Sequence, residues 1–294
     1  MREVLILSGK GGTGKTSVTA AFAHLSCDAV LCDLDVDAPD LHLILRPEIS
    51  ERNTFSSGGE AVIREERCTN CGTCGDLCRF GAVLTGDSHP RVDPIRCEGC
   101  KVCVHFCPED AIDFVPRDCG EWSIGRTRFG PMVHAQLFPG EENSGKLVAL
   151  LRQEAKQLAK SKEMSLILSD GPPGIGCPVI SSVSGQDTAV LVTEPTPSGL
   201  HDLERVAQLC RHFRLPAAVL INKYDLNERG TQRIRGYCKE NDIPVVGELP
   251  YDPSFVDAMV AGQALTEYAD GETAGRLRDT WRRIQQLASL RAAA

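Results

Sequence analysis

The chain has 294 residues, a formal net charge of −8 and 14 cysteines, and this length can bury one large core plus a small module. Because the charge balance is acidic and no basic stripe runs along the sequence, nonspecific nucleic-acid binding is disfavoured. No apolar run approaches the ~20 residues of a membrane span and no charged-then-apolar leader opens the sequence, so we expect a cytoplasmic, reducing location without a membrane partner.

The first predicted element is an apolar strand over Val4–Leu7 that runs directly into a glycine-rich loop. Glycines allow backbone conformations that a side chain forbids, so successive N–H groups can turn toward phosphate oxygens. A helix starting near Thr16 points its positive end at the same anion. Lys15 is expected to reach the β- and γ-phosphates, and the Thr16 hydroxyl to hold Mg2+. The predicted phosphate-binding residues are Gly11, Gly12, Thr13, Gly14, Lys15, Thr16 and Ser17.

Two further predicted strands end in carboxylates. Ala29–Asp35 is an apolar run that closes on Asp33 and Asp35, and Ser165–Ser169 leads into Asp170. Both suit buried parallel strands that deliver charge at their carboxyl ends. The Gly/Pro run over 171–174 is typical of a loop that changes course when a γ-phosphate leaves. Each carboxylate alone is weak evidence, but their order after a phosphate-binding loop makes them strong together.

Later strands are predicted over Asp187–Val192 and Ala217–Ile221, so strands and helices alternate through most of the chain. This alternation predicts an α/β fold with a mostly parallel sheet flanked by helices. The last of these strands ends in Asn222-Lys223-Tyr224-Asp225. This matches the Asn-Lys-x-Asp pattern by which GTPases recognise guanine. GTP therefore remains an alternative to ATP as the ligand.

Eight of the 14 cysteines lie between positions 68 and 107, in two runs spaced Cys-x2-Cys-x2-Cys-x3-Cys. This is the spacing of bacterial two-cluster ferredoxins, in which the fourth cysteine of each run ligates the other cluster. One [4Fe–4S] cluster is therefore expected on Cys68, Cys71, Cys74 and Cys107, and the other on Cys97, Cys100, Cys103 and Cys78. Zinc is the main rival, because Cys-x2-Cys pairs also make structural zinc sites, although with a longer gap between pairs. Disulfides are less favoured because nothing marks the chain for export.

The cysteine block interrupts the strand–helix alternation, so we predict that it is an insert. The nucleotide domain then comprises 1–60 and 116–294, and residues 61–115 form a small α+β ferredoxin-like domain. Such a module has too little apolar surface to fold alone, so loss of its clusters should unfold it first. The last predicted helix, Thr273–Leu290, is expected to pack on the larger domain through one apolar face, made of Leu277, Trp281, Ile284 and Ala288.

The segment Lys10–Thr16 resembles the deviant Walker A motif of the MinD, ParA and nitrogenase iron protein group. The resemblance implies that Lys10 crosses a dimer interface to complete the partner's site, with ATP between two protomers. It implies that Asp35 orients the attacking water, with Asp33 in the outer shell of the Mg2+ and Asp170 as the Walker B carboxylate; Lys10, Lys15 and Asp35 are thus the catalytic set. It favours ATP over GTP, and the implied base-binding residues are Asn222, Asp225, Pro250 and Asp252.

Nearly all of the chain resembles a MinD-type ATPase with an inserted two-cluster ferredoxin domain, a subgroup that also shares the stretch Arg126–Gly145. Some members are associated with the orange protein complex of anaerobic bacteria. Cys177 resembles a cysteine with which the nitrogenase iron protein bridges its subunits, and plain packing is the alternative. Cys27, Cys32, Cys210 and Cys238 lie in apolar or helical contexts and are expected to be buried.

Two classes of function remain. In the first, the ATP or ADP state of a homodimer, or of a heterodimer with a paralogue, controls electron transfer or the docking of a redox protein. In the second, the protein is a cluster scaffold, a carrier, or a positioning ATPase whose clusters are cargo or structural. Two complete ferredoxin-type cysteine sets favour the first class.

Overall fold

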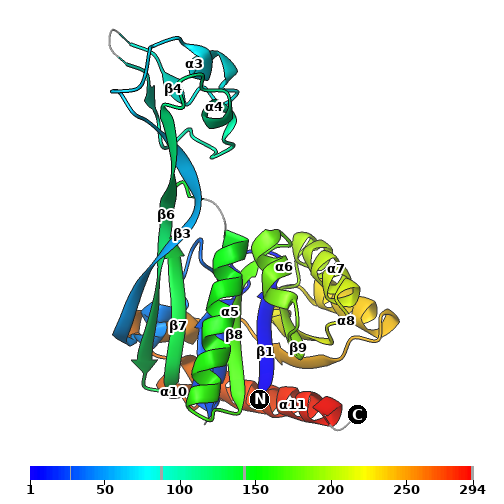
Figure 1. The fold of residues 1–294 in the computed structure, drawn as a ribbon. Coiled ribbons are helices and arrows are strands. Elements are labelled where there is room, and N and C mark those ends of the chain that lie inside the picture. The colour runs from blue at the N-terminus through cyan, green and yellow to red at the C-terminus, as the bar shows by residue number, and fades with distance from the viewer. Residues whose placement is uncertain (27, 87–88, 142–143, 293–294) are drawn as a thin grey trace. The chain divides into compact units, whose positions relative to one another are not determined.

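The computed structural model describes residues 1–26, 28–86, 89–141 and 144–292, and of 288–292 the backbone only. Cys27 and the side chain of Ala288 therefore lie outside the described residues. The chain forms two compact units (Figure 1), the first made of Met1–Asn53, Glu121–Leu137 and Ser144–Ala294 and the second of Thr54–Gly120 and Phe138–Asn143. The predicted insert, 61–115, lies within the second unit.

In the described part of the chain, the main sheet has nine strands in the order β11-β10-β9-β1-β8-β2-β7-β6-β3. The strands are β1 (Arg2–Ser8), β2 (Ala29–Asp33), β3 (Glu48–Ile63), β6 (Ile112–Thr127), β7 (Gly130–Leu137), β8 (Leu166–Pro173), β9 (Thr188–Thr193), β10 (Ala217–Asn222) and β11 (Val245–Leu249). All neighbours from β11 to β7 pair in parallel. The predicted α/β fold with a mostly parallel sheet is confirmed.

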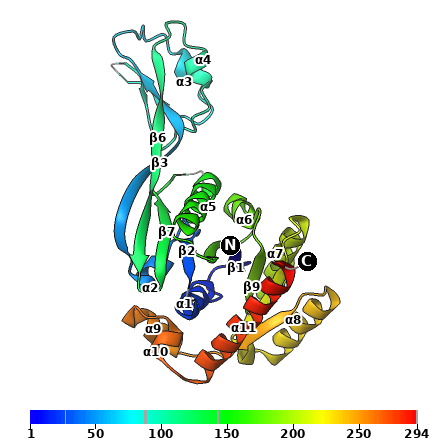
Figure 2. The same ribbon diagram turned by 60° about the horizontal axis from the view of Figure 1, so that its bottom comes forward.

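Helices cover both faces of this sheet (Figure 2). The helices of the first unit are α1 (Lys15–Leu25), α2 (Leu41–Leu45), α5 (Ser144–Ser161), α6 (Cys177–Val183), α7 (Pro197–His212), α8 (Glu228–Glu240), α9 (Ser254–Ala261), α10 (Leu265–Tyr268) and α11 (Glu272–Ala292), with a short 3-10 turn at Tyr224–Leu226. One apolar core joins α1, α10 and α11 to the sheet, and Phe22 stacks on Trp281 with ring centroids 5.0 Å apart. The predicted packing of the last helix is confirmed, because Leu277, Trp281 and Ile284 are buried.

The strand register decides where the charged side chains of the first unit meet. Asp33 pairs with Asp170 across β2 and β8, and Ile6 of β1 pairs with the same Asp170. Because parallel strands end at the same edge, their carboxyl ends bring the glycine loop and the carboxylates together. One detail differs from expectation: β8 continues to Pro173, since Ser8 pairs with Pro173 after a register shift, so the loop predicted over 171–174 begins only at Gly174.

The second unit is small and contains little regular structure. Its own elements are α3 (Thr73–Leu77), β4 (Val83–Leu84), β5 (Arg91–Val92) and α4 (Val102–His105), joined by the ends of β3 and β6. β4 and β5 pair antiparallel. A small core cluster in this unit joins Ala61, Cys74 and Ile112, with half-buried aliphatic side chains and cysteines packed against them.

Candidate functional site

The glycine loop lies between the end of β1 at Ser8 and the start of α1 at Lys15. Gly12 and Gly14 take φ values of 79° and 89°, a region that disfavours side chains. Gly14 is also crowded, because a Cβ there would lie 2.5 Å from Asn222 Nδ2. No described side chain caps the N-terminus of α1, so its first amides are left for an anion.

Asp170 is the centre of the charged cluster behind this loop. It is fully buried and accepts hydrogen bonds from the hydroxyls of Thr16 and Thr19, each at 2.7 Å. Lys15 Nζ lies 2.9 Å from an Asp170 carboxylate oxygen. Burial lowers the pKa of Lys15, but Asp170, Asp35 and Asp33 outweigh it and raise the pKa overall, so Lys15 stays charged.

The two carboxylates after β2 lie beside this cluster. Asp33 is fully buried and accepts from the backbone N–H groups of Asp35 at 3.1 Å and Leu41 at 3.2 Å. Burial and the nearby Asp170 raise the pKa of Asp33. Asp35 lies 3.8 Å from Lys15 Nζ, and burial raises its pKa to about 6 although Lys15 opposes the shift.

These residues can take part in binding Mg2+ without forming a complete cage. Among the described residues, no three His, Cys, Asp or Glu side chains are placed to hold a metal ion by themselves. Mg2+ is commonly bound through one or two carboxylates together with substrate phosphates and waters. The Thr16 hydroxyl and the Asp170 carboxylate, in contact with each other, suit that mode.

Lys10 is held by its own chain. Its Nζ lies 2.6 Å from Glu194 and donates to the hydroxyls of Thr196 at 3.2 Å and Ser198 at 3.0 Å. Glu194 also pairs with Lys223 at 3.1 Å, and the two lysines lower the pKa of Glu194 although burial acts against them. A Lys10 that reaches a partner subunit must first leave this cluster.

The sequence pointed to Lys10 but missed Glu194 and Lys223. Lys223 also donates to the Gly12 carbonyl at 3.1 Å, so it braces the glycine loop. Glu194 directly follows β9, whose carboxyl end lies at the same sheet edge as those of β1 and β8. This position at a strand end could have identified Glu194 from the sequence. Lys223 could not be identified in this way, because its hydrogen bonds form only in the folded loop.

The predicted base-binding residues brace the neighbouring loops. Asn222 is buried and its Nδ2 donates to the Thr13 carbonyl at 2.8 Å. Asp225 accepts from the N–H of Tyr251 at 2.7 Å, which ties it to the loop that follows Pro250. Asp252 accepts from the Thr273 hydroxyl at 2.6 Å, and this bond lowers its pKa. Ser17 instead faces α9, where its hydroxyl lies 3.4 Å from Met259 Sδ.

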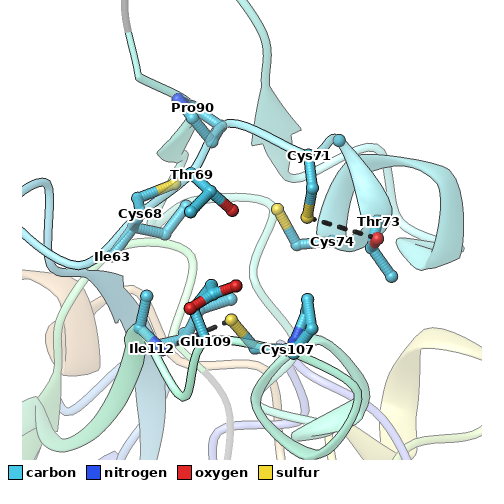
Figure 3. A pocket seen from close by; sticks show the side chains of 13 residues that line it. Ile63, Cys68, Thr69, Cys71, Thr73, Cys74, Pro90, Cys107, Glu109 and Ile112 are labelled. Carbon is cyan, nitrogen blue, oxygen red and sulfur yellow. Dashed lines mark hydrogen bonds between the residues drawn. The ribbon is translucent and has the colours of Figure 1, made fainter.

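Four of the eight clustered cysteines line one cavity in the second unit (Figure 3). They are Cys68, Cys71 and Cys74 of the first run and Cys107 of the second. This is the crossed set that the ferredoxin spacing predicts for one cluster. A four-iron cube binds each thiolate at a different iron, so it holds its ligands farther apart than one ion does. Four thiols are the complete ligand set of such a cube, so the chemistry of the donor set fits it.

The two cysteine runs are folded alike, with each residue matched by one 29 positions later, as Cys68 is by Cys97. The Ala82 N–H donates to Cys78 Sγ at 3.3 Å, and its counterpart Ala111 donates to Cys107 Sγ at the same distance. The matched pairs with positive φ are Asn70 and Gly99, Gly72 and Lys101, and Gly81 and Asp110. The second set, Cys97, Cys100, Cys103 and Cys78, therefore repeats the local geometry of the first.

Local hydrogen bonds and burial act on these thiols in opposite directions. The Thr73 hydroxyl and amide lower the pKa of Cys71. Burial raises the pKa of Cys74 and of Cys103, whereas backbone amides around Cys78 outweigh its burial and lower its pKa. Hydrogen bonds to sulfur stabilise the thiolate, which is the form that binds metal.

The other described cysteines lie outside the two runs. Cys32, Cys210 and Cys238 are buried as expected, and burial raises the pKa of Cys210 to about 12 and of Cys238 to about 11. Cys119 is buried in β6, and its thiol lies 3.2 Å from the Ser57 carbonyl. Cys177 is exposed at the start of α6.

A glycine loop between a strand and a helix, with carboxylates at the ends of neighbouring parallel strands, defines a P-loop nucleotide-binding protein. Residues 4–265 match the model of the CobQ/CobB/MinD/ParA nucleotide binding domain, so the chain belongs to that family. Among the described residues, no helix has the length and apolar character needed to cross a bilayer.

Several known proteins are similar to this chain. An uncharacterized protein of Methanocaldococcus jannaschii, MJ0578, is 35% identical over 76% of this chain and 79% of its own length. A cytosolic Fe-S cluster assembly factor Nubp1 homolog of Drosophila ananassae is 28% identical over 92% of this chain and 77% of its own. One component of the Na(+)-translocating ferredoxin:NAD(+) oxidoreductase complex of Acetobacterium woodii is 40% identical over 63 residues, which are 21% of this chain and 19% of that component.

A solved structure supports the fold. The septum site-determining protein MinD of Pyrococcus horikoshii, complexed with Mg-ADP, superposes with a TM-score of 0.57 at 19% identity, over 98% of both chains.

Proposed function

We propose that this protein is an ATP-hydrolysing iron–sulfur protein in which nucleotide-dependent dimerisation controls electron transfer or the docking of a redox protein. The observation that carries the proposal is the presence, in one chain, of a complete P-loop site and of two cysteine runs, with Cys68, Cys71, Cys74 and Cys107 around one cavity.

The nucleotide half of the proposal assigns a role to each residue at the sheet edge. Lys15 and the amides of residues 11–17 would bind the phosphates, and Thr16 and Asp170 would hold Mg2+, with Asp33 behind them. Asp35 would orient the attacking water; its pKa of about 6 leaves it ionised at neutral pH. Asn222, Asp225, Pro250 and Asp252 would surround the base, and ATP is preferred to GTP because the early Lys10 marks dimer-forming ATPases.

Dimerisation is proposed on the basis of Lys10. In this account the γ-phosphate of the partner's ATP competes with Glu194 for Lys10, whose present contacts are an ion pair and two hydroxyls. The dimer would be a homodimer or would pair this chain with a paralogue. We place it in the cytoplasm, with no role in nucleic-acid binding and none at the membrane.

The redox half of the proposal places the two clusters in a ferredoxin-like insert at 61–115. When bound, the clusters would take up and release single electrons. The chain's part is to present eight thiolates and to donate the Ala82 and Ala111 amides to Cys78 and Cys107. The likeness to a component of a ferredoxin:NAD(+) oxidoreductase complex, over a length that suits this insert, supports the assignment.

Anaerobic purification followed by iron, acid-labile sulfide and zinc analysis tests the proposal. We expect about eight irons and eight sulfides per chain, as two four-iron clusters require. Cys107→Ser should lose about half of them, whereas Cys177→Ser, outside both runs, should lose none. Colourless protein that contains zinc would contradict the proposal.

A scaffold or carrier of clusters is the second candidate, and the likeness to a cluster assembly factor favours it. The two candidates differ in how tightly the clusters are held. Anaerobic incubation with an apo-ferredoxin, followed by separation and iron analysis of both proteins, distinguishes them. Retention of iron by this chain supports electron transfer, and rapid transfer supports the carrier.

A further inference from the structure

The two cysteine runs have the same fold but different surroundings within the second unit. A Cβ at Gly99 would collide with the carbonyl oxygen of Gly59 in β3, so the second run packs directly on that strand. Lys101 Nζ lies 4.2 Å from the ring centroid of Phe114 in β6. At Gly72, the counterpart of Lys101, a Cβ would meet no described atom within 4 Å apart from those of its immediate chain neighbours. The second run thus contacts β3 and β6 at Gly99 and Lys101, whereas the first run packs on them through Cys74, which clusters with Ala61 and Ile112.

The strongest of these anchors is Arg117 of β6. Its Nη1 donates to the carbonyl of Cys97 at 3.1 Å, while Nε and Nη2 donate to one carboxylate oxygen of Glu141 at 2.9 and 2.5 Å. The two side chains are only 19% and 13% exposed, so the ion pair is poorly screened. Glu141 raises the pKa of Arg117 against the effect of burial.

The first run has an ion pair beside it that is more exposed: Arg64 Nε lies 3.3 Å from the Asp113 carboxylate, and these side chains are 30% and 47% exposed, so solvent screens this pair more. Arg64 and its neighbour Arg67 also contact Asp110, through its carbonyl at 2.6 Å and its carboxylate at 3.8 Å. Glu141 itself belongs to the Arg126–Gly145 stretch, for which the sequence offered no mechanism. In the structure, Glu141 fixes the Arg117 guanidinium, and Arg117 in turn fixes the Cys97 loop.

We propose that Arg117 and Glu141 form a positioning pair that makes the second cluster, on Cys97, Cys100, Cys103 and Cys78, differ in reduction potential from the first. This inference rests on the proposed function. A cluster's potential depends on nearby charge and on the hydrogen bonds of its ligand loops, and charges act strongly where burial lowers the effective dielectric. The intact pair is neutral overall and fixes the loop, so removing either member changes the charge beside one cluster only.

The two single variants should act in opposite directions. Arg117→Gln leaves the Glu141 carboxylate uncompensated, which disfavours an added electron, so the potential of the second cluster should become more negative. Glu141→Gln leaves the Arg117 charge, so the same potential should become more positive. The double variant should return toward wild type. A purely structural role would shift both variants the same way.

The test is an anaerobic redox titration of the full chain followed by EPR, with Cys100→Ser used to assign the second cluster's signal. Arg96→Gln is the matched control, because Arg96 adjoins Cys97 in sequence but is 61% exposed and pairs with Asp93 at 3.4 Å. We expect opposite shifts confined to the second cluster and a smaller shift in the control. Unchanged potentials, equal shifts in both clusters, or shifts matched by Arg96→Gln would overturn the proposal.

Two outcomes remain distinct from these. If Arg117→Gln loses only the second cluster, the protein keeps half the iron and the first EPR signal; this result supports the anchoring role. The direction of the potential shift is then measured in Glu141→Gln. Wild-type protein without clusters contradicts the proposed function and this inference together, whereas wrong signs in a fully loaded protein contradict the inference alone.

Discussion

The two units position their functional groups in different ways. In the first unit, a large apolar core with wholly buried strands sets the register that brings Asp33, Asp170 and the glycine loop together. In the second, a small core cluster centres on Ala61, Cys74 and Ile112, and thiols take part in its packing. One site is built on a fold that burial stabilises. The other belongs to a unit with little buried apolar surface, and we propose that bound clusters stabilise it.

The largest effect should follow metal removal. If the thiols hold clusters, chelating the iron anaerobically should unfold the second unit and leave the first folded. Hydrogen exchange measured by mass spectrometry should show loss of protection over 61–115, with β1, β8 and α1 still protected. Equal loss in both units, or none, would contradict the contrast between them.

Removing Lys15 should have the next largest effect, confined to the first unit. Lys15→Ala deletes the charge that faces the phosphates and should weaken nucleotide binding on the order of 100-fold. Lys10→Ala is the control, because it should spare binding in the monomer yet block dimerisation and hydrolysis. Calorimetry and sedimentation with ATP would check both, and full turnover in Lys10→Ala would count against a shared site.

Acid should destabilise the first unit through His134. Its ring stacks on His42 with centroids 5.3 Å apart and planes 4° apart, and its Nε2 is buried without a partner among the described residues. Burial, with His42 and Arg52, lowers its pKa from 6.5 to about 4. At pH values between these two, His134 is protonated in the unfolded chain and neutral in the folded chain. The free energy of unfolding should therefore fall as the pH drops through this window, by about 3 kcal/mol at most.

The check on this prediction is denaturant unfolding between pH 7 and 4 with His134→Phe beside the wild type. The variant should lose most of that acid-dependent decline. An unchanged slope would show that other groups dominate it.

The smallest predicted effect concerns Glu194. Glu194→Gln removes the ion pair that holds Lys10, so dimerisation with ATP should strengthen roughly threefold to fivefold, the scale of a partly exposed pair. Ser198→Ala, which removes one hydroxyl contact and keeps the charges, is the control and should change less. Weaker dimerisation in Glu194→Gln would mean that Glu194 supports the active arrangement instead.

The features that could be predicted from the sequence are those encoded in short, contiguous motifs. The glycine loop, the strand-end carboxylates and the two cysteine runs are contiguous patterns, and each was readable before folding. The contacts of Lys10 with Glu194 and of Arg117 with Glu141 join separate segments, so no spacing rule could reveal them. Strands β3 and β6 were missed as well. They lie next to each other in the sheet although they are far apart in the sequence, and neither 48–63 nor 112–127 is a continuous apolar run.

The central claim is that the nucleotide site and the clusters act on each other, and the most direct test is to measure both cluster potentials in anaerobically prepared protein with ADP and then with a non-hydrolysable ATP analogue. The account predicts that at least one potential shifts between the two nucleotides and that Lys10→Ala abolishes the shift. Potentials that are identical with either nucleotide would contradict it.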